Sequence, residues 1–472
     1  MTDPDAATND RPTAVGLRKY GGLRKSGDQT HLCNAPVTNL YFRTDGLAVP
    51  CWLQIGDART NRWSPETSIS DIWSSAYLEN LRSDLADGRM GGMCWLCKNS
   101  IDEGTRPLAL AYEDVEPNPG YRWPSMIELE LSNQCNLECV MCQGTLSHLI
   151  RKNRERLPPL PQVYDEVFVE QLREFIPHLT ELRFNGGEPL VQQLVFDICE
   201  IVYEINPELR ITIATNGNVL NDRVKSHFQR GNFHVNISID SLRPGRYEAI
   251  RPRSDHAKLM ENFFWFREYC DSQDRILSVQ VNPMRHNWDE MAEIMDWALR
   301  NDTRCWYNVV RYPLHSSLWN LPAAELAEIH QAWCAVEFAH DPRTTRVEVF
   351  ENNMTAWNHL VNDQMAIWVL EQHDREANGE DDALDATQPL AIGGAQAQQA
   401  VTVQIVPRVY RQPAPEPLAP VAAEPEPPLA EAKPHGPATT TGPEAPMPLH
   451  IRIRRSLSHR LRAYRQPRSN AS

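Results

Sequence analysis

Three cysteines stand close together in the first third of this 472-residue chain, in the order C-x3-C-x2-C. They are Cys135, Cys139 and Cys142, and they directly follow a strand-like stretch at 126–132. Three thiolates at this spacing can bind three irons of a [4Fe–4S] cube and leave the fourth iron without a protein ligand. An open iron is a place for chemistry, whereas a fully ligated cube mainly stores or passes electrons. A partial zinc site is the alternative, but structural zinc takes four ligands, often from C-x2-C pairs. The spacing therefore favours iron–sulfur.

A second group of cysteines lies nearer the N-terminus and comprises Cys33, Cys51, Cys94 and Cys97. The first two flank a predicted hairpin, in which the turn Asp45-Gly46 separates two apolar runs. The other two form a C-x2-C pair that follows a predicted helix at 70–85. Four thiolates suffice for one fully ligated [4Fe–4S] cluster, and they also satisfy zinc. We favour iron–sulfur and keep a structural zinc site as the alternative.

The remaining cysteines and several histidines have no partner that the sequence reveals. Isolated thiols usually pack as small apolar groups, so we expect core packing for Cys199, Cys270, Cys305 and Cys334. We expect structural rather than catalytic roles for His148, His178 and His234. Asp240, at the end of a predicted strand, either lies near the site or caps a helix.

The composition limits the classes of protein to which the chain can belong. A net charge of -15 argues against nucleic acid as the main partner, because phosphate binding needs a basic face. The first ten residues are polar and acidic, unlike a signal peptide, and no run of about 18 apolar residues predicts a membrane span. Eleven cysteines without an export signal fit a reducing cytoplasm, where clustered thiols usually bind metal. We therefore expect a cytoplasmic protein.

Strand and helix patterns alternate after about residue 121 and must position these groups. Strands are expected near 126–132, 181–185, 210–215, 234–239, 276–282 and 304–310. Helices are expected near 163–177, 190–205, 219–230, 255–271 and 287–301. This alternation predicts an α/β fold with a parallel sheet covered by helices, and the site at the C-terminal strand ends. Six units are too few for a full (β/α)8 barrel.

The chain divides into six predicted segments. They are a disordered N-terminus (1–28), a compact turn-rich domain (29–120), the strand–helix core (121–310), a helical extension (311–377), a disordered Pro/Ala-rich linker (378–448) and a basic amphipathic tail (449–472). The extension carries four tryptophans that would close one side of the core or line a substrate groove: Trp319, Trp333, Trp357 and Trp368. The tail could contact an acidic partner, a membrane surface or nucleic acid, but a solvated tail is favoured.

Three motifs follow the cysteine run and resemble the radical S-adenosylmethionine (radical SAM) enzymes. Gly186-Gly187-Glu188-Pro189 is similar to the GGEP motif of that superfamily, and Thr215-Asn216-Gly217 to its TNG motif. The stretch 235–241, which contains Ser238, is similar to its fourth strand. The four motifs stand in the family's order over about residues 121–310, which makes the resemblance specific. It implies an open, partial (β/α)6 barrel.

The resemblance also implies a cofactor site. Cys135, Cys139 and Cys142 would ligate the cluster, and S-adenosylmethionine would chelate the fourth iron. Gly186 and Gly187 would let the strand end approach this ligand, and Glu188 would accept a hydrogen bond from its ammonium group. Thr215, Asn216 and Ser238 would bind its carboxylate and ribose hydroxyls. Reduction would release a 5′-deoxyadenosyl radical that takes a hydrogen atom from the substrate. Met141 departs from the aromatic residue most common before the last cysteine, which affects only packing against adenine.

The N-terminal quartet resembles the auxiliary-cluster modules called twitch or SPASM domains. The resemblance implies a small α+β iron–sulfur domain before the barrel, with a second [4Fe–4S] cluster. Relatives with such modules often modify peptides or proteins, so a peptide or protein substrate is expected, with a sugar or other small metabolite as the alternative. A low-potential donor such as flavodoxin or ferredoxin would supply electrons. The rival hypothesis is a non-catalytic iron–sulfur or zinc scaffold, against which the intact GGEP motif argues.

Overall fold

The computed structural model describes residues 10–24, 30–54 and 61–378. The predicted linker (378–448) and basic tail (449–472) lie outside these described residues, except for Asn378. Within the described ranges, no helix has both the length and the apolar composition that a membrane crossing requires.

Nine strands form one sheet in the order β3-β2-β1-β4-β5-β6-β7-β8-β9. The strands are β1 (Asn39–Phe42), β2 (Leu47–Val49), β3 (Asn61–Arg62), β4 (Met126–Leu129), β5 (Glu181–Phe184), β6 (Arg210–Thr215), β7 (Asn232–Ser238), β8 (Leu277–Val281) and β9 (Arg304–Tyr307). Strands β4 to β9 pair in parallel, which confirms the predicted α/β fold and each of its six strands. The sheet is an open, partial barrel in the part of the chain that is described.

The N-terminal hairpin belongs to this same sheet. Strands β1 and β2 pair antiparallel around Gly46, whose φ of 84° suits glycine, and this confirms the predicted hairpin. However, β1 also pairs in parallel with β4, with Asn39 opposite Met126. The sheet therefore crosses the predicted domain boundary at 120/121. A second, smaller core around the quartet, with Leu85, Met90 and Ile101, remains local to the N-terminal segment.

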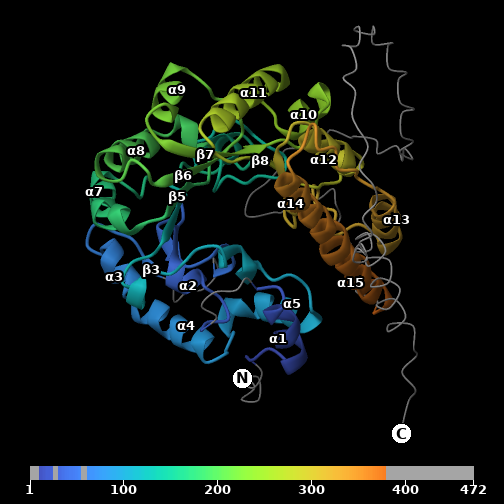
Figure 1. Cartoon of the computed structure of the whole chain (residues 1–472), viewed down its shortest axis with the longest axis horizontal. Helices are drawn as coiled ribbons and strands as arrows, with labels where there is room; N and C mark the ends of the chain where they lie inside the picture. The colour runs from blue at the N-terminus through green and yellow to red at the C-terminus, as the bar shows by residue number, and fades with distance from the viewer. Residues whose placement is uncertain (1–9, 25–29, 55–60, 379–472) are drawn as a thin grey trace, which may run out of the picture. The chain divides into compact units, whose positions relative to one another are not determined.

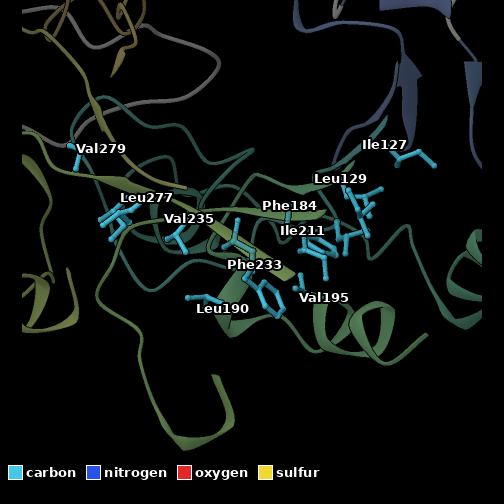
Figure 2. Close-up of a cluster of buried hydrophobic side chains, with 14 of the residues drawn as sticks. Ile127, Leu129, Phe184, Leu190, Val195, Ile211, Phe233, Val235, Leu277 and Val279 are labelled. Carbon is cyan, nitrogen blue, oxygen red and sulfur yellow. The ribbon is translucent and has the colours of Figure 1, made fainter. Parts of the chain in front are cut away.

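The two faces of the sheet differ in chemistry because side chains alternate along each strand. One row of neighbouring strands is apolar and fully buried: Leu40, Ile127, Leu182, Ile211 and Phe233. The next row, one residue further along each strand, lies on the opposite face and is mostly polar: Tyr41, Glu128, Arg183, Thr212 and His234. We call this polar side the inner face. Figure 2 shows part of the apolar core, where Ile127, Phe184 and Ile211 lie with Leu190 and Val195.

The apolar face is covered by helices that follow each strand of the parallel sheet. They are α7 (Glu166–Phe175), α8 (Gln193–Ile205), α9 (Asp222–Phe228), α10 (Pro244–Ile250), α11 (His256–Ser272) and α12 (Met291–Arg300). All lie close to predicted ranges except α10, which the sequence did not predict. Figure 1 shows α7, α8, α9 and α11 outside strands β5 to β8. Asp165 begins α7 by accepting hydrogen bonds from the Val167 and Phe168 backbone N–H groups, as an N-cap residue does.

The N-terminal segment is more ordered than the sequence predicted. Helix α1 (Ala14–Gly21) lies within the segment expected to be disordered, so that prediction is wrong for this part. Thr13 caps the helix, and the buried Tyr20 donates its hydroxyl to the Leu32 carbonyl at 2.7 Å. Close packing of Gly16 against the Ile101 carbonyl fixes α1 on α5. Short polar segments can thus be ordered by a few tertiary contacts that composition does not reveal.

The predicted helix at 70–85 is divided into α3 (Ile69–Trp73) and α4 (Ala76–Ala86). Ser75 adopts an extended conformation and accepts a hydrogen bond from the Leu78 N–H, so it starts a new helix inside an apolar pattern that looks continuous. The other helices of this region are α2 (Ala35–Thr38), α5 (Trp95–Glu103) and α6 (His148–Asn153).

The C-terminal extension consists of α13 (Ala323–Cys334), α14 (Val347–Asn358) and α15 (Ala366–Ala377), with a π-helical turn at His359–Met365. Trp333, Trp357 and Trp368 are buried, which agrees with the first of their two expected roles, closing one side of the core. They pack into the main core and close one side of it. Cys334 is exposed, unlike the buried Cys199, Cys270 and Cys305, so core packing is wrong for this one thiol.

Candidate functional site

The three-cysteine loop leaves the C-terminal end of β4 and is held by hydrogen bonds to its backbone. His148, at the start of α6, accepts a bond from the Cys135 N–H at 3.2 Å through Nδ1. Arg154 donates to the carbonyls of Cys139 and Cys142, at 3.2 and 2.6 Å. These hydrogen bonds hold the backbone of the loop and do not involve its three thiols. His148 therefore supports the loop, in agreement with its expected structural role.

The three thiols lie together in a small cluster with Leu137 and Met141. Burial raises the pKa of Cys135 and of Cys142 to about 12, and it also raises the pKa of Cys139. Buried thiols of this kind become thiolates when a cation binds them. Met141 also contacts the apolar group around Met284, so it packs in the place where an aromatic residue was expected.

The GGEP segment follows β5 and lies directly against the start of the cysteine loop. Gly186 and Gly187 have φ values of 67° and 59°, which glycine adopts without strain. A Cβ atom on Gly187 would lie 2.4 Å from the Gln134 carbonyl oxygen, and the Glu188 N–H donates to that same oxygen at 2.7 Å. Gly187 is therefore required by close packing of the two loops, a reason that the sequence did not reveal.

The carboxylate of Glu188 joins the GGEP segment to the TNG segment. It is fully buried, and it accepts hydrogen bonds from the Thr215 hydroxyl at 2.8 Å and the Asn216 N–H at 2.7 Å. The Leu190 N–H is a third donor, at 3.2 Å. Burial raises the pKa of Glu188 to about 7. The Glu188 carboxylate is thus hydrogen-bonded within the chain itself. Its contact with the ammonium group of a ligand stays a prediction.

The TNG and fourth-strand motifs complete the arrangement at the C-terminal strand ends. Asn216 donates from Nδ2 to Oδ1 of Asn136, at 2.8 Å, and so links β6 to the cysteine loop. Ser238 ends β7, is half-buried, and lies on the inner face in register with Gln280. The structure therefore brings together all predicted residues of the first site: Cys135, Cys139, Cys142, Gly186, Gly187, Glu188, Thr215, Asn216 and Ser238.

A cavity of about 510 Å³ opens beside this site. It is lined by Cys135 and its neighbours on the loop, by His148, by Thr44 of the hairpin turn and by Gln162. A cavity of this size is within the range of small-molecule sites. The cavity therefore lies next to Cys135, the first cysteine of the run.

Sequence reasoning missed Arg251, which lies after α10 and is buried beside the thiols. Its Nη1 is 3.8 Å from Sγ of Cys139, and its Nε donates to Asp240 at 2.8 Å. Asp240 is fully buried and also accepts from Asn282, so it is near the site, one of its two expected placements. Arg251 stands among several arginines in the sequence, and no local pattern distinguishes it from them.

The N-terminal quartet is also assembled. Cys33 and Cys97 belong to the smaller core, and Cys51 and Cys94 pack against it. Burial, together with the neighbouring thiols of Cys51, Cys97 and Cys94, raises the pKa of Cys33. The Tyr112 hydroxyl, buried close to Cys51 and Cys33, has no hydrogen-bond partner within the described chain. Four thiols and a polar atom without a partner suit a site that takes a bound group.

Both cysteine groups fit iron–sulfur clusters by the chemistry of their donors. In the described ranges, no three His, Cys, Asp or Glu side chains converge as they would around a single metal ion. Each thiolate of a cluster binds a different iron, so cluster ligands need not converge on one point. The donor sets, three and four sulfurs, match an open cube and a fully ligated cube.

Comparison with known proteins identifies the barrel. Residues 129–298 match the family model described as the Radical SAM superfamily. The chain is 26% identical over 178 residues to a GTP 3′,8-cyclase of Streptomyces coelicolor, covering 37% of this chain and 50% of the relative. It is 30% identical over 183 residues to a GTP 3′,8-cyclase of Petrotoga mobilis, covering 37% and 50%. The chain thus spans about half the length of these curated relatives.

Solved structures show only a weak overall likeness. Streptococcus suis SuiB bound to S-adenosylmethionine matches with a TM-score of 0.35 and 12% identity, over 60% of this chain and 64% of that one. A TM-score this low supports no argument about function. The family model and the motifs at the strand ends carry the assignment. Over residues 129–298, which hold most of the parallel sheet and its motif loops, the chain is similar to the radical SAM superfamily.

Proposed function

We propose that this protein is a radical SAM enzyme that removes a hydrogen atom from an unreactive carbon of its substrate. The observation that carries the proposal is the meeting of three motif loops at one edge of the sheet. Glu188 binds Thr215 and Asn216, and Asn216 binds Asn136 of the cysteine loop. In a parallel sheet this edge is where sites form.

Cys135, Cys139 and Cys142 would hold a [4Fe–4S] cluster, with S-adenosylmethionine at the remaining iron. When bound, these groups supply a 5′-deoxyadenosyl radical that accepts a hydrogen atom from the substrate. Thr215, Asn216 and Ser238 would bind and orient the nucleotide through its carboxylate and ribose hydroxyls. Glu188 keeps the two flanking loops together, and Arg251 places a positive charge beside Cys139.

Cys33, Cys51, Cys94 and Cys97 would hold a second, fully ligated [4Fe–4S] cluster of the twitch or SPASM kind. A low-potential donor such as flavodoxin or ferredoxin would deliver electrons to the protein. Support for the second cluster is the assembly of the four thiols in one small core. Structural zinc remains the alternative for this donor set.

A peptide or protein residue is the proposed substrate. The inner face carries carboxamide side chains, which in this structure bond to one another and to Glu128 and Asp240: Asn185, Asn236, Gln280, Asn282 and Asn308. Carboxamides match the amide groups of a peptide backbone, which also donate and accept.

A purine nucleotide is the second candidate, because the curated relatives are GTP 3′,8-cyclases. The matched region covers only half of those proteins, so their substrate does not transfer with the barrel. A sugar or other small metabolite is the third class. The discriminating measurement is the effect of GTP, of a peptide library and of sugar nucleotides on 5′-deoxyadenosine yield.

The central experiment is anaerobic reconstitution with iron and sulfide, followed by dithionite and S-adenosylmethionine. We expect 5′-deoxyadenosine from the wild type and none from Cys139→Ala. Cys305→Ala is the matched control, because Cys305 is a buried thiol on β9 outside both clusters. No product from wild-type protein that carries its full iron content would instead support the non-catalytic scaffold.

A further inference from the structure

The geometry points to Glu128 as a positioning residue that couples the cysteine quartet to the cofactor site of the barrel. Occupancy of the quartet would then change the affinity for S-adenosylmethionine, although the two sites lie at opposite ends of β1 and β4. This inference rests on the proposed function, because it assumes that both sites bind their groups.

Glu128 is a fully buried carboxylate in the middle of β4, and it contacts both sides. Oε2 accepts a hydrogen bond from Nε1 of Trp52, the residue after Cys51, at 3.2 Å. The same oxygen accepts one from Nδ2 of Asn185, the residue before Gly186, at 3.2 Å. A single buried atom is therefore bonded to the neighbour of a quartet cysteine and to the neighbour of the GGEP glycines.

The quartet side of this bridge is short. Trp52 and Gln54 belong to one 3-10 turn (Trp52–Gln54) directly after Cys51. Gln54 donates from Nε2 to Sγ of Cys94 at 3.1 Å, while Trp52 donates to Glu128. One turn thus contacts two quartet cysteines and the barrel. If this turn shifts when the quartet binds its cluster, the Trp52–Glu128 hydrogen bond must shift with it.

The barrel side is equally direct. Asn185 continues β5, and its N–H donates to the Leu129 carbonyl at 2.8 Å, so it is fixed to β4 by its backbone as well. The next two residues, Gly186 and Gly187, have left-handed conformations with no space for a Cβ atom. A displacement of Asn185 therefore transfers to the GGEP segment and to the Gln134 carbonyl with which that segment packs.

The charge of Glu128 makes the bridge sensitive to the loss of either donor. Oε1 accepts from Nδ2 of Asn39 at 2.8 Å, and the nearest cation, Arg183, is 4.0 Å away. Burial raises the pKa of this carboxyl, so the charged form depends on its donors. Hydrogen bonds to a charged group are among the stronger ones in proteins. Removing the Trp52 donor should therefore reposition the carboxylate.

Trp52→Phe tests the bridge, because it deletes the indole N–H and keeps an aromatic ring at a site that is 43% exposed. Trp95→Phe is the matched control: Trp95 follows Cys94, is 48% exposed, and makes no hydrogen bond through its ring to any described residue. Both variants are reconstituted as holoprotein. Affinity for S-adenosylmethionine is measured from the change that it causes in the electron paramagnetic resonance spectrum of the reduced cluster, and iron content is measured in parallel.

We expect Trp52→Phe to weaken S-adenosylmethionine binding about fivefold and Trp95→Phe to change it less than about twofold, with equal iron contents. In a Cys94→Ala/Cys97→Ala background the effect of Trp52→Phe should disappear. Equal affinities for the two variants would overturn the coupling, as would loss of iron from Trp52→Phe alone. An undiminished effect in the quartet-free background would also overturn it.

Glu128→Gln provides a second variant that keeps the size of the side chain. In either orientation of the amide, its NH2 group faces a hydrogen-bond donor, Asn39 or the Trp52–Asn185 pair. An NH2 group cannot accept, so the hydrogen bonds on that side are lost. Its affinity for S-adenosylmethionine should fall at least as far as that of Trp52→Phe. Wild-type holoprotein that binds no S-adenosylmethionine would refute the proposed function itself, a result distinct from equal affinities among variants.

Discussion

Gly187→Ala should damage the cofactor site by pushing the GGEP segment away from the cysteine loop. A Cβ atom at this position would lie 2.4 Å from the Gln134 carbonyl oxygen and 2.9 Å from that of Ser132. Both are backbone atoms, so neither can rotate away. The residue must also keep a φ of 59°, which costs an L-residue about 1–2 kcal/mol. Overpacking adds about 1–3 kcal/mol, for a total of about 3 kcal/mol.

Two other glycines separate these contributions. Gly120 has a φ of 65° and no atom within 4 Å of its Cβ position, so Gly120→Ala pays only the conformational cost. Gly186 has a φ of 67°, and its Cβ would meet Cγ and Cβ of Glu130, at 2.6 and 2.8 Å, which are side-chain rather than carbonyl atoms, so Gly186→Ala should fall between the other two. An unfolding entropy of about 2.1 cal/mol/K per residue over the described ranges gives about 1.3 °C per kcal/mol, so Gly187→Ala should lower the melting temperature by about 4 °C and Gly120→Ala by about 2 °C.

The assay is thermal unfolding of the anaerobically purified variants, together with iron content and S-adenosylmethionine affinity. Gly187→Ala should also lose affinity and part of its iron, because the carbonyl against which it pushes belongs to Gln134, the residue directly before Cys135. Gly120→Ala should keep both. If Gly187→Ala and Gly120→Ala had the same melting temperature and the same affinity, the loops would not be packed as the structure shows, and the reasoning would be refuted.

Three further predictions concern charges and cysteines. Burial raises the pKa of Glu130 to about 7, above its usual 4.5, so the folded state holds a proton that the unfolded state has released. Stability should therefore fall as pH rises from about 5 to 7, by at most about 3 kcal/mol, and Glu130→Gln should lose this part of the pH dependence of the melting temperature. Arg251→Gln leaves the buried Asp240 without its cation and should cost about 3 kcal/mol, whereas Arg251→Gln/Asp240→Asn should recover most of it; an unstable double variant would contradict this. Cys94→Ala/Cys97→Ala should lower the iron content by about half and leave the first cluster intact, while bound zinc with unchanged iron would reject the second cluster.

The strands and the motif loops could be predicted because each depends on local sequence. Apolar alternation identified β4 to β9, and the order of the GGEP and TNG motifs behind the cysteines placed Glu188 and Thr215 at one edge. Contacts between distant residues could not be predicted in this way. The clash that forbids a side chain on Gly187 involves Gln134, more than fifty residues away, and nothing near either residue signals it.

The same limit explains an error in the N-terminal segment and an open alternative in the C-terminal one. Helix α1 forms because Tyr20 and Gly16 find partners at Leu32 and Ile101, and the segment is too polar for its own pattern to indicate a helix. Trp333, Trp357 and Trp368 are buried by neighbouring helices, whereas their spacing is equally compatible with an exposed face. Arg251 could not be separated from other arginines, because its role depends on the buried Asp240.

The position of the quartet follows from the direction of one short strand pair. Because β1 runs parallel to β4, its C-terminal end lies at the edge where the cysteine loop begins. Cys33 precedes β1, and Cys51 follows the antiparallel β2, so both lie near the opposite end, where Asn39 donates to the Pro50 carbonyl at 3.0 Å. The four residues of β1 span only about 10 Å at the usual rise per residue. A module placed before the barrel in sequence therefore becomes one wall of it, and Glu128, in the middle of that wall, is within reach of both sites.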